Sequence, residues 1–279
     1  MEGFDGHTYM MRPCAILSQE DGVIFADLAL ARRIEAAEAE NARGCSPQPG
    51  APALAVAGGC AIFAGMDSPL TQAVGLGLNG PVSAAQIGAL EAFFRSRGAP
   101  VRVDLCPLAD SGLVDALAER GYRATEFNNV LVKRLGGTEI VLTPRVRRAV
   151  AGERDLWAHA VGMGFFEQQE LSTEEMDVGR AIFAMPGALC YVAVSANGEP
   201  AGGGVLSIRD GLATLFADST IVRFRRAGLH REVIQARLNE ALARNCELAT
   251  ASTLPASESQ RNYERLGFQV VYTRITLVG

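Results

Sequence analysis

The segment that decides the fold runs from Asp218 to Arg231 and reads DSTIVRFRRAGLHR. It joins an apolar run, 212–217, to an amphipathic segment, 229–245, so we expect a strand, a basic turn and a helix. The first turn of a helix has backbone N–H groups without intrahelical partners and carries the positive end of the macrodipole. Gly228 lets a ligand approach the backbone closely, and the flanking arginines add positive charge. The turn therefore predicts a phosphate or pyrophosphate site.

The strand before this turn belongs to a predicted three-stranded meander. Three apolar runs, 190–195, 203–208 and 212–217, are separated by Asn197-Gly198 and Asp210-Gly211. Asn-Gly and Asp-Gly between apolar runs are typical of tight hairpin turns. We therefore expect three antiparallel strands, of which the third leads into the basic turn.

The other elements follow from periodicity and from helix start and stop signals. Ser83 with Gln86 and Ser257 with Gln260 are capping-box pairs, each at the start of a predicted helix. Residues 46–50, within the segment 44–52, predict a surface loop. Helices are expected at 23–40, 83–97, 111–120, 155–162, from Ser172 onward, 229–245 and from Ser257 to Leu266. Strands are expected as a pair within 53–65 and at 101–105, from Tyr122 toward Leu135, 139–142, 247–253 and 268–278.

The two halves of the chain repeat one order of elements. In each half a helix and a strand are followed by a proline, Pro107 or Pro255, and then by a short helix that starts at a serine. The segment Gly136-Gly137-Thr138 is the predicted boundary. We therefore predict two copies of one fold, with domains at residues 1–136 and 137–279.

The second half resembles the GNAT superfamily of acyl-CoA-dependent N-acyltransferases. The resemblance depends on the meander, on Arg225-x-x-Gly228 at the start of a helix, and on the ending NYERLGF at 262–268. It covers residues 139–279, and more weakly 53–135. It implies a tandem GNAT with a degenerate N-terminal copy. Each α/β (α+β) domain would have a mixed, mostly antiparallel central sheet flanked by helices.

The resemblance also implies a site for acetyl-CoA as co-substrate. Backbone groups near Asp218, Ser219 and Thr220 would pair with the pantetheine arm, and Tyr263 would act as general acid near the sulfur. The residues implied for the pyrophosphate are Arg225, Arg226, Ala227, Gly228, Leu229, His230 and Arg231.

Three positions depart from the family pattern. His230 stands where the pattern prefers Gly or Ala, and Ala256 where an Asn is frequent. The strand before Pro255 contains no glutamate that could act as a general base. The identity of the base is therefore open.

Direct transfer of an acetyl group to an amine sets the chemistry that the site must provide. An alkylammonium has a pKa of about 10.4, so deprotonation at neutral pH costs roughly 4–5 kcal/mol without a base. Asp218 is the carboxylate nearest the expected reaction centre, as a base or ammonium partner, although a strand-end cap is an equal alternative. Glu167 lies in the loop expected on the acceptor side, and we interpret it as a substrate contact. Tyr263 could instead simply pack between helix and sheet.

Composition excludes several classes of function. The net charge of −5 disfavours general nucleic-acid binding. No apolar run reaches the length of a membrane span, and no export signal is visible, so we expect a cytoplasmic protein without a membrane partner. The six cysteines are scattered and only three histidines exist, so no metal site is expected. The acceptor, a small-molecule amine or a peptide amine, is not specified, and a homodimer is left open.

Two alternative functions remain open. The missing base and the missing Asn favour a non-catalytic acyl-CoA-binding regulatory module. The segment Gly75 to Gly80 matches Gly-x-Gly-x-x-Gly and precedes a helix, which is typical of dinucleotide-dependent oxidoreductases. Pro69 and Gln72 interrupt the strand that such a fold needs, so we assign the segment to the third meander strand of the first copy. That copy lacks Arg-x-x-Gly, and we expect it not to bind CoA.

Overall fold

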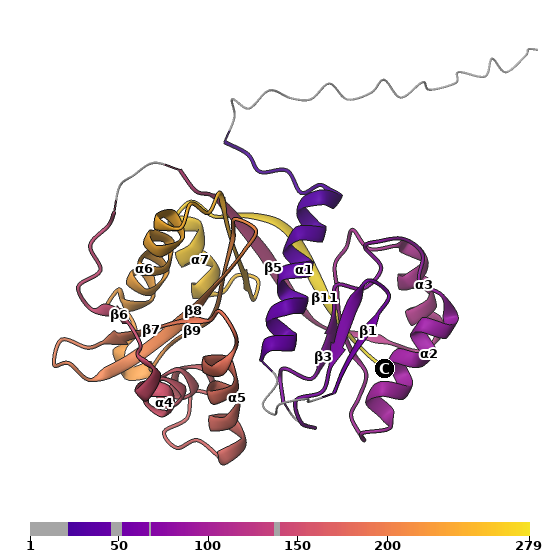
Figure 1. Ribbon diagram of the computed structural model, residues 1–279, viewed down its shortest axis with the longest axis horizontal. Coiled ribbons are helices and arrows are strands. Elements are labelled where there is room, and N and C mark those ends of the chain that lie inside the picture. Colours follow the sequence, from indigo (N-terminus) through magenta and orange to yellow (C-terminus); the bar gives the residue numbers. More distant parts are fainter. Residues whose placement is uncertain (1–21, 46–51, 67, 137–139) are drawn as a thin grey trace, which may run out of the picture.

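The computed structural model describes residues 22–45, 52–66, 68–136 and 140–279 (Figure 1). Eleven strands form one sheet in the order β1-β2-β3-β4-β11-β5-β10-β9-β8-β7-β6. The strands are β1 Ala53–Val56, β2 Gly59–Ile62, β3 Gln72–Val74, β4 Arg102–Leu105, β5 Arg123–Arg134, β6 Val146–Arg148, β7 Leu189–Val194, β8 Pro200–Arg209, β9 Leu212–Thr220, β10 Leu248–Thr253 and β11 Gln269–Val278. The helices are α1 Leu28–Gly44, α2 Ala84–Arg95, α3 Ser111–Glu119, α4 Arg154–Phe165, α5 Thr173–Ala184, α6 Leu229–Ala243 and α7 Glu258–Arg265. Two 3₁₀ turns, η1 Ala151–Glu153 and η2 Val222–Phe224, complete the elements.

The two halves repeat one succession of elements. A three-stranded antiparallel meander, β1–β3 or β7–β9, is followed by a helix, a parallel strand, a short helix and a last strand. The last strands are exchanged, because β5 of the first half pairs with β10 and β11 of the second half pairs with β4. β5 and β11 also pair with each other along almost their full length. Each half is therefore completed by the other, and the division at residues 136 and 137 stays a prediction.

Helices cover both faces of the sheet. Neighbouring residues of β9 and β10 pack in opposite directions: Leu212 and Leu248 contact the core beneath α1, whereas Ala213 and Ala249 contact the core beneath α6 and α7. α4 and α5 lie on the same face as α1, where Trp157 is fully buried. In Figure 1, α1 stands between the α4–α7 group and the α2–α3 pair.

Local sequence signals account for most element boundaries. Ser83 and Ser172 form complete capping boxes with Gln86 and Glu175 at the starts of α2 and α5. The meander turns have left-handed residues at Gly198, Asp210 and Gly211, as hairpin turns with Asn-Gly or Asp-Gly require. The meander, the helices and the last strand are confirmed to within a few residues.

The structure corrects three predictions. Ile140–Leu142 form no strand; Val141 instead exchanges hydrogen bonds with the Asn239 side chain on α6, and the first strand of the second half is β6. Gly75–Gly80 form a turn after β3 rather than the strand itself. Ser257 caps α7, but the Gln260 side chain accepts from Ala256 N, so the box is not reciprocal.

The remaining expectations concern one loop, the cysteines and the membrane. The predicted loop at 46–50 and Cys14 lie outside the described residues. The other five cysteines are buried and free, and burial raises the pKa of Cys45 and Cys190 to about 12. Among the described helices, none has the length and apolar character to cross a bilayer.

Candidate functional site

The strands β9 and β10 part at the centre of the sheet. They pair in parallel only from Leu212↔Leu248 to Leu215↔Ala251. β9 continues to Thr220 and β10 to Thr253. Backbone groups of both strands beyond Leu215 and Ala251 therefore do not bond to each other, which leaves polar groups of the backbone to face a ligand.

A β-bulge in β9 lies directly beyond this point. The register with β8 shifts between Gly203↔Ser219 and Val205↔Phe216, so β9 carries one extra residue, and Ala217 has a φ of 51°. A bulge re-aims the side chains beside it. As a result Asp218 turns toward α6, over Gly204 of the neighbouring strand.

Asp218 is the centre of a buried polar network. Its Oδ1 pairs with Nη1 of Arg237 on α6, and its Oδ2 accepts from the hydroxyl of Tyr263 on α7. Nε2 of His230 lies 3.1 Å from Oδ2, and the Asn262 amide lies 3.1 Å from Nδ1 of the same ring. An amide that donates to Nδ1 leaves Nε2–H to donate to Asp218. The two predicted catalytic residues are thus in direct contact, in a network that joins β9, α6 and α7.

Neighbouring groups set the pKa values of Asp218 and Tyr263. Burial alone would raise the pKa of Asp218, but the Arg237 guanidinium and the His230 hydrogen bond outweigh it and the pKa is lowered. Burial and the Asp218 charge raise the pKa of Tyr263 well above its ordinary value. At neutral pH the site therefore holds an ionised carboxylate and a protonated phenol. Asp218 is 9% exposed at its side chain and Tyr263 is 1% exposed.

The basic turn has the backbone geometry of an anion site. Arg226 and Gly228 both have left-handed φ values, 65° and 80°, and Gly228 is the N-cap of α6. The first amide of α6 with an intrahelical partner is that of Glu232, which donates to Gly228 O. The earlier amides, from Arg226 to Arg231, are thus the orphan donors of a helix start. Among the predicted residues from Arg226 to Arg231, four are exposed: Arg226, Ala227, Gly228 and Arg231.

The remaining predicted residues are engaged by the protein itself. Arg225 donates to Thr220 O and Gly164 O, each at 3.1 Å, and pairs with Glu167 at 2.8 Å. The Ser219 hydroxyl donates to Val161 O at 2.7 Å. Leu229, the first residue of α6, is buried in the core against Ala193 of β7 and Ala201 of β8. Glu167 is thus brought to the end of β9 through Arg225, on the loop that follows α4.

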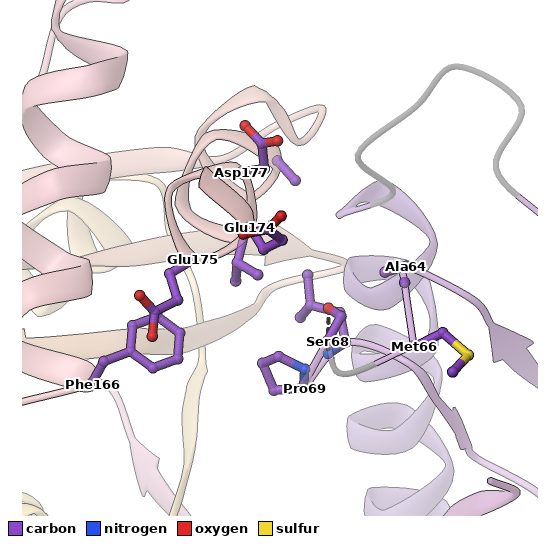
Figure 2. Close-up of a pocket in the computed structure, with 12 residues that line it drawn as sticks. Ala64, Met66, Ser68, Pro69, Phe166, Glu174, Glu175 and Asp177 are labelled. Carbon is purple, nitrogen blue, oxygen red and sulfur yellow. Dashed lines mark hydrogen bonds between the residues drawn. The ribbon is translucent and has the colours of Figure 1, made fainter. Parts of the chain in front are cut away.

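A cavity of about 440 Å³ lies between the two halves (Figure 2). α5 provides one wall with Glu174, Glu175 and Asp177, and residues 64–66 and 68–70 provide the other. Two of these carboxylates already have partners, because Glu175 caps its own helix and Asp177 pairs with Arg180. Phe166, next to Glu167 in sequence, also lines this cavity.

The Gly75–Gly80 loop occupies the same place in the first half as the basic turn in the second. Its backbone is engaged: Gly77 N donates to Ala57 O, and Gly77 O accepts from Asp110 N. Leu76 and Leu78 are buried. These contacts leave fewer groups for a phosphate. That the first half binds no CoA stays a prediction from its missing Arg-x-x-Gly. Among the described residues, no cluster of three His, Cys, Asp or Glu side chains could hold a metal ion.

Sequence reasoning missed Arg237 and Asn262. Arg237 is fully buried, and it lies on the apolar stripe of α6 with Ile234, Leu238 and Ala241. A charged residue within an apolar stripe requires a buried partner of opposite sign. That signal could have pointed to Asp218, although the bulge that aims the carboxylate could not be read from the sequence.

Comparisons with known proteins identify the fold. No protein-family model matches the sequence, and no curated protein matches it. Among solved structures, a GCN5-related N-acetyltransferase from Kribbella flavida superposes with a TM-score of 0.64 at 18% identity, over 89% of this chain and 95% of the other. A GCN5-related N-acetyltransferase from Sphaerobacter thermophilus superposes with a TM-score of 0.52 at 14% identity, over 70% and 66%. The chain therefore has the GNAT fold, as expected from the sequence.

Proposed function

We propose that this protein is an N-acetyltransferase that transfers the acetyl group of acetyl-CoA directly to an amine. The observation that carries the proposal is the succession of parted strands, left-handed turn and helix start along 212–231. Each part suits one part of an acyl-CoA: the parted strands suit the pantetheine amides, and the turn suits the pyrophosphate. The shared fold supports the same assignment.

The donor would lie along the second half only. The amides from Arg226 to Arg231 would bind the pyrophosphate, and the exposed side chains of Arg226 and Arg231 would add charge. Arg225 would act differently from the sequence-based expectation of a phosphate contact, because its guanidinium ties Glu167 to the end of β9. Ser219 would contribute its backbone, since its hydroxyl is engaged.

Tyr263 would provide the proton for the leaving thiolate. Its raised pKa keeps the phenol protonated at neutral pH, so the proton is present when the carbon–sulfur bond breaks. Asp218 orients this hydroxyl, and its contacts with Arg237 and His230 support a positioning role more than that of a free base.

A non-catalytic acyl-CoA-binding module is the second candidate. The hydrogen bond from Tyr263 to Asp218 favours it, because donation to a thiolate requires this bond to be broken or shared. A module that only senses acyl-CoA would need the turn but not a transferable phenolic proton.

Calorimetry and thiol release separate these candidates. We expect acetyl-CoA to bind with measurable heat, and NAD to give none. We expect free thiol to appear when acetyl-CoA is mixed with the protein and a panel of primary amines. Binding without thiol release for any amine would favour the sensing module, and absence of acetyl-CoA binding by the folded protein would overturn both.

A further inference from the structure

A second buried polar cluster lies between α1 and the centre of the sheet. Glu35 of α1 accepts from Nε of Arg274 at 2.7 Å and from the Tyr272 hydroxyl at 2.8 Å. Nη1 of the same Arg274 lies 3.5 Å from Glu38 Oε1 and 3.1 Å from Ser252 Oγ. One guanidinium on β11 thus connects two carboxylates of α1 to the end of β10.

This cluster has more negative than positive groups. Asp104 of β4 lies on the same face and accepts from Thr276, two residues after Arg274, at 2.6 Å. Two carboxyl groups therefore contact the one guanidinium, and Asp104 adds a third carboxyl group nearby without contacting it. Glu35 and Arg274 form the most buried pair, with side chains 1% and 7% exposed. Within the described residues, Glu35 Oε2 and Arg274 Nη2 have no partner although both are buried. Buried polar atoms usually have a hydrogen-bond partner, so the cluster has capacity to bind a polar group of a ligand.

Glu38 is the member of the cluster that a ligand can reach. Its side chain is 24% exposed, whereas Glu35 is enclosed. Ser252 is exposed even though β10 is an inner strand of the sheet. Both oxygens contact the same nitrogen of Arg274, so one small polar group can lie close to both.

The cluster lies on the correct side of the sheet for an acceptor. Ser252 is the first residue of β10 beyond the last pair with β9, Leu215↔Ala251. The opposite face at this point is filled by Tyr263, Ala251 and the α6–α7 core, on the side where the donor turn begins α6. A nucleophile must approach the thioester carbonyl from a face that the donor does not fill. That face is the one covered by α1.

We propose that Glu38, supplied by the first half of the chain, accepts the ammonium proton of the acceptor amine at the parting of β9 and β10. This inference deepens the proposed function and rests on it. It gives the first half a role in the chemistry of the second, with Arg274 and Ser252 as positioning residues. It also defines the acceptor as a primary amine that is cationic before it reacts.

The step balances as a proton transfer followed by acyl transfer. The ammonium gives one proton to the Glu38 carboxylate, and the free nitrogen forms a bond to the acetyl carbon. The carbon–sulfur bond breaks, the thiolate gains a proton from Tyr263, and the second proton of the nitrogen passes through solvent to restore the Tyr263 hydroxyl. The products are the N-acetyl amine, CoA thiol and one proton that Glu38 returns to water.

Two amines with the same carbon skeleton test the proposal. Ethylamine is protonated at neutral pH, whereas 2,2,2-trifluoroethylamine is mostly neutral and needs no base before attack. We expect Glu38→Gln to reduce kcat/KM for ethylamine about 100-fold or more, the range of a general base. For trifluoroethylamine the loss should be far smaller, and acetyl-CoA affinity by calorimetry should not change. A structural defect would reduce kcat/KM for both amines by the same factor.

Glu40→Gln is the matched control, because Glu40 lies on α1 two residues away and pairs only with exposed arginines. It should leave both rates unchanged. If Glu38→Gln lowers kcat/KM equally for the two amines, or does not lower it at all, the inference is overturned while the proposed function stays intact. If the wild-type protein binds acetyl-CoA but transfers acetyl to no amine, both the proposed enzyme and this inference fail.

Discussion

The hydroxyl of Tyr263 donates to the carboxylate of Asp218, across the core between α7 and the end of β9. The two residues lie 45 positions apart in sequence, and both are buried. The contact joins the terminal helix to the strand that leads into the basic turn. It also fixes the phenol in a single orientation, which is what a proton donor in a preorganised site requires.

Asp218 should contribute strongly to folding stability. Asp218→Asn keeps the shape of the side chain and an acceptor for Tyr263, but it leaves the Arg237 charge buried without a counter-charge. Loss of one partner of a buried pair typically costs about 3–5 kcal/mol. Urea unfolding should show a decrease of that size, whereas Asp210→Asn, with a side chain 88% exposed, should change the free energy of unfolding by less than about 0.5 kcal/mol. A decrease below 1 kcal/mol for Asp218→Asn would contradict the buried-pair account.

Gly204 should be required for the same ion pair. A Cβ at this position would lie 2.7 Å from Asp218 Oδ1 and 2.8 Å from Arg237 Nη1, closer than a carbon atom can approach. We expect Gly204→Ala to lower the free energy of unfolding by roughly 1–3 kcal/mol, as overpacking does. Gly152→Ala is the control, because a Cβ there meets nothing within 4 Å. The loss at Gly204 should shrink in an Asp218→Ala background, where the overlapping carboxylate is absent; full additivity in this double-mutant cycle would argue against a shared contact.

The elements that the sequence predicted are those with local causes. Ser83 with Gln86, Ser172 with Glu175 and the Asn-Gly and Asp-Gly turns act within a few residues, so their outcome could be read directly. The exchange of β5 and β11 could not be read, because these pairings join residues far apart in sequence and no local signal marks them. Residues 140–142 are apolar and β-prone, yet the nearby polar partner is Asn239 on α6, a tertiary contact that overrides propensity.

In the candidate site, too, only the features with local sequence signals could be predicted. The turn from Arg225 to Arg231 could be predicted because strand, glycine and helix follow each other in sequence. The partners of Asp218 and the contact between Glu38 and Arg274 could not, since they join residues 12 to 236 positions apart. Burial of Arg237 depends on the bulge at Ala217, for which the sequence carries no clear mark.

Gly228 should matter more for acetyl-CoA than for folding. Its φ of 80° is strained for any residue with a Cβ, and such strain costs about 1–2 kcal/mol. Gly187 provides a matched control, with a φ of 79° and open space around it. Gly228→Ala and Gly187→Ala should therefore lose similar stability in thermal unfolding. Calorimetry should show weaker acetyl-CoA binding only for Gly228→Ala, and equal affinities in the two variants would show that Gly228 is purely structural.

Glu38 should make the stability of the protein depend on pH. Burial raises its pKa above the ordinary 4.5; Glu35 on its own helix and Asp104 on β4 act in the same direction, and Arg274 on β11 opposes them. A carboxyl group whose pKa is higher in the folded state stabilises the fold while it is protonated, below its unfolded pKa. That contribution is lost as the pH rises through the folded pKa.

Glu38→Gln removes this titration. The free energy of unfolding of the variant minus that of the wild type should therefore increase as the pH rises from about 4 to 8, measured by urea unfolding at each pH. Glu40→Gln, on the same helix, is the control for removing a carboxylate from α1. A difference for Glu38→Gln that falls with rising pH would mean that Arg274 stabilises the ionised form more than burial and the neighbouring carboxylates destabilise it, contrary to the environment described above.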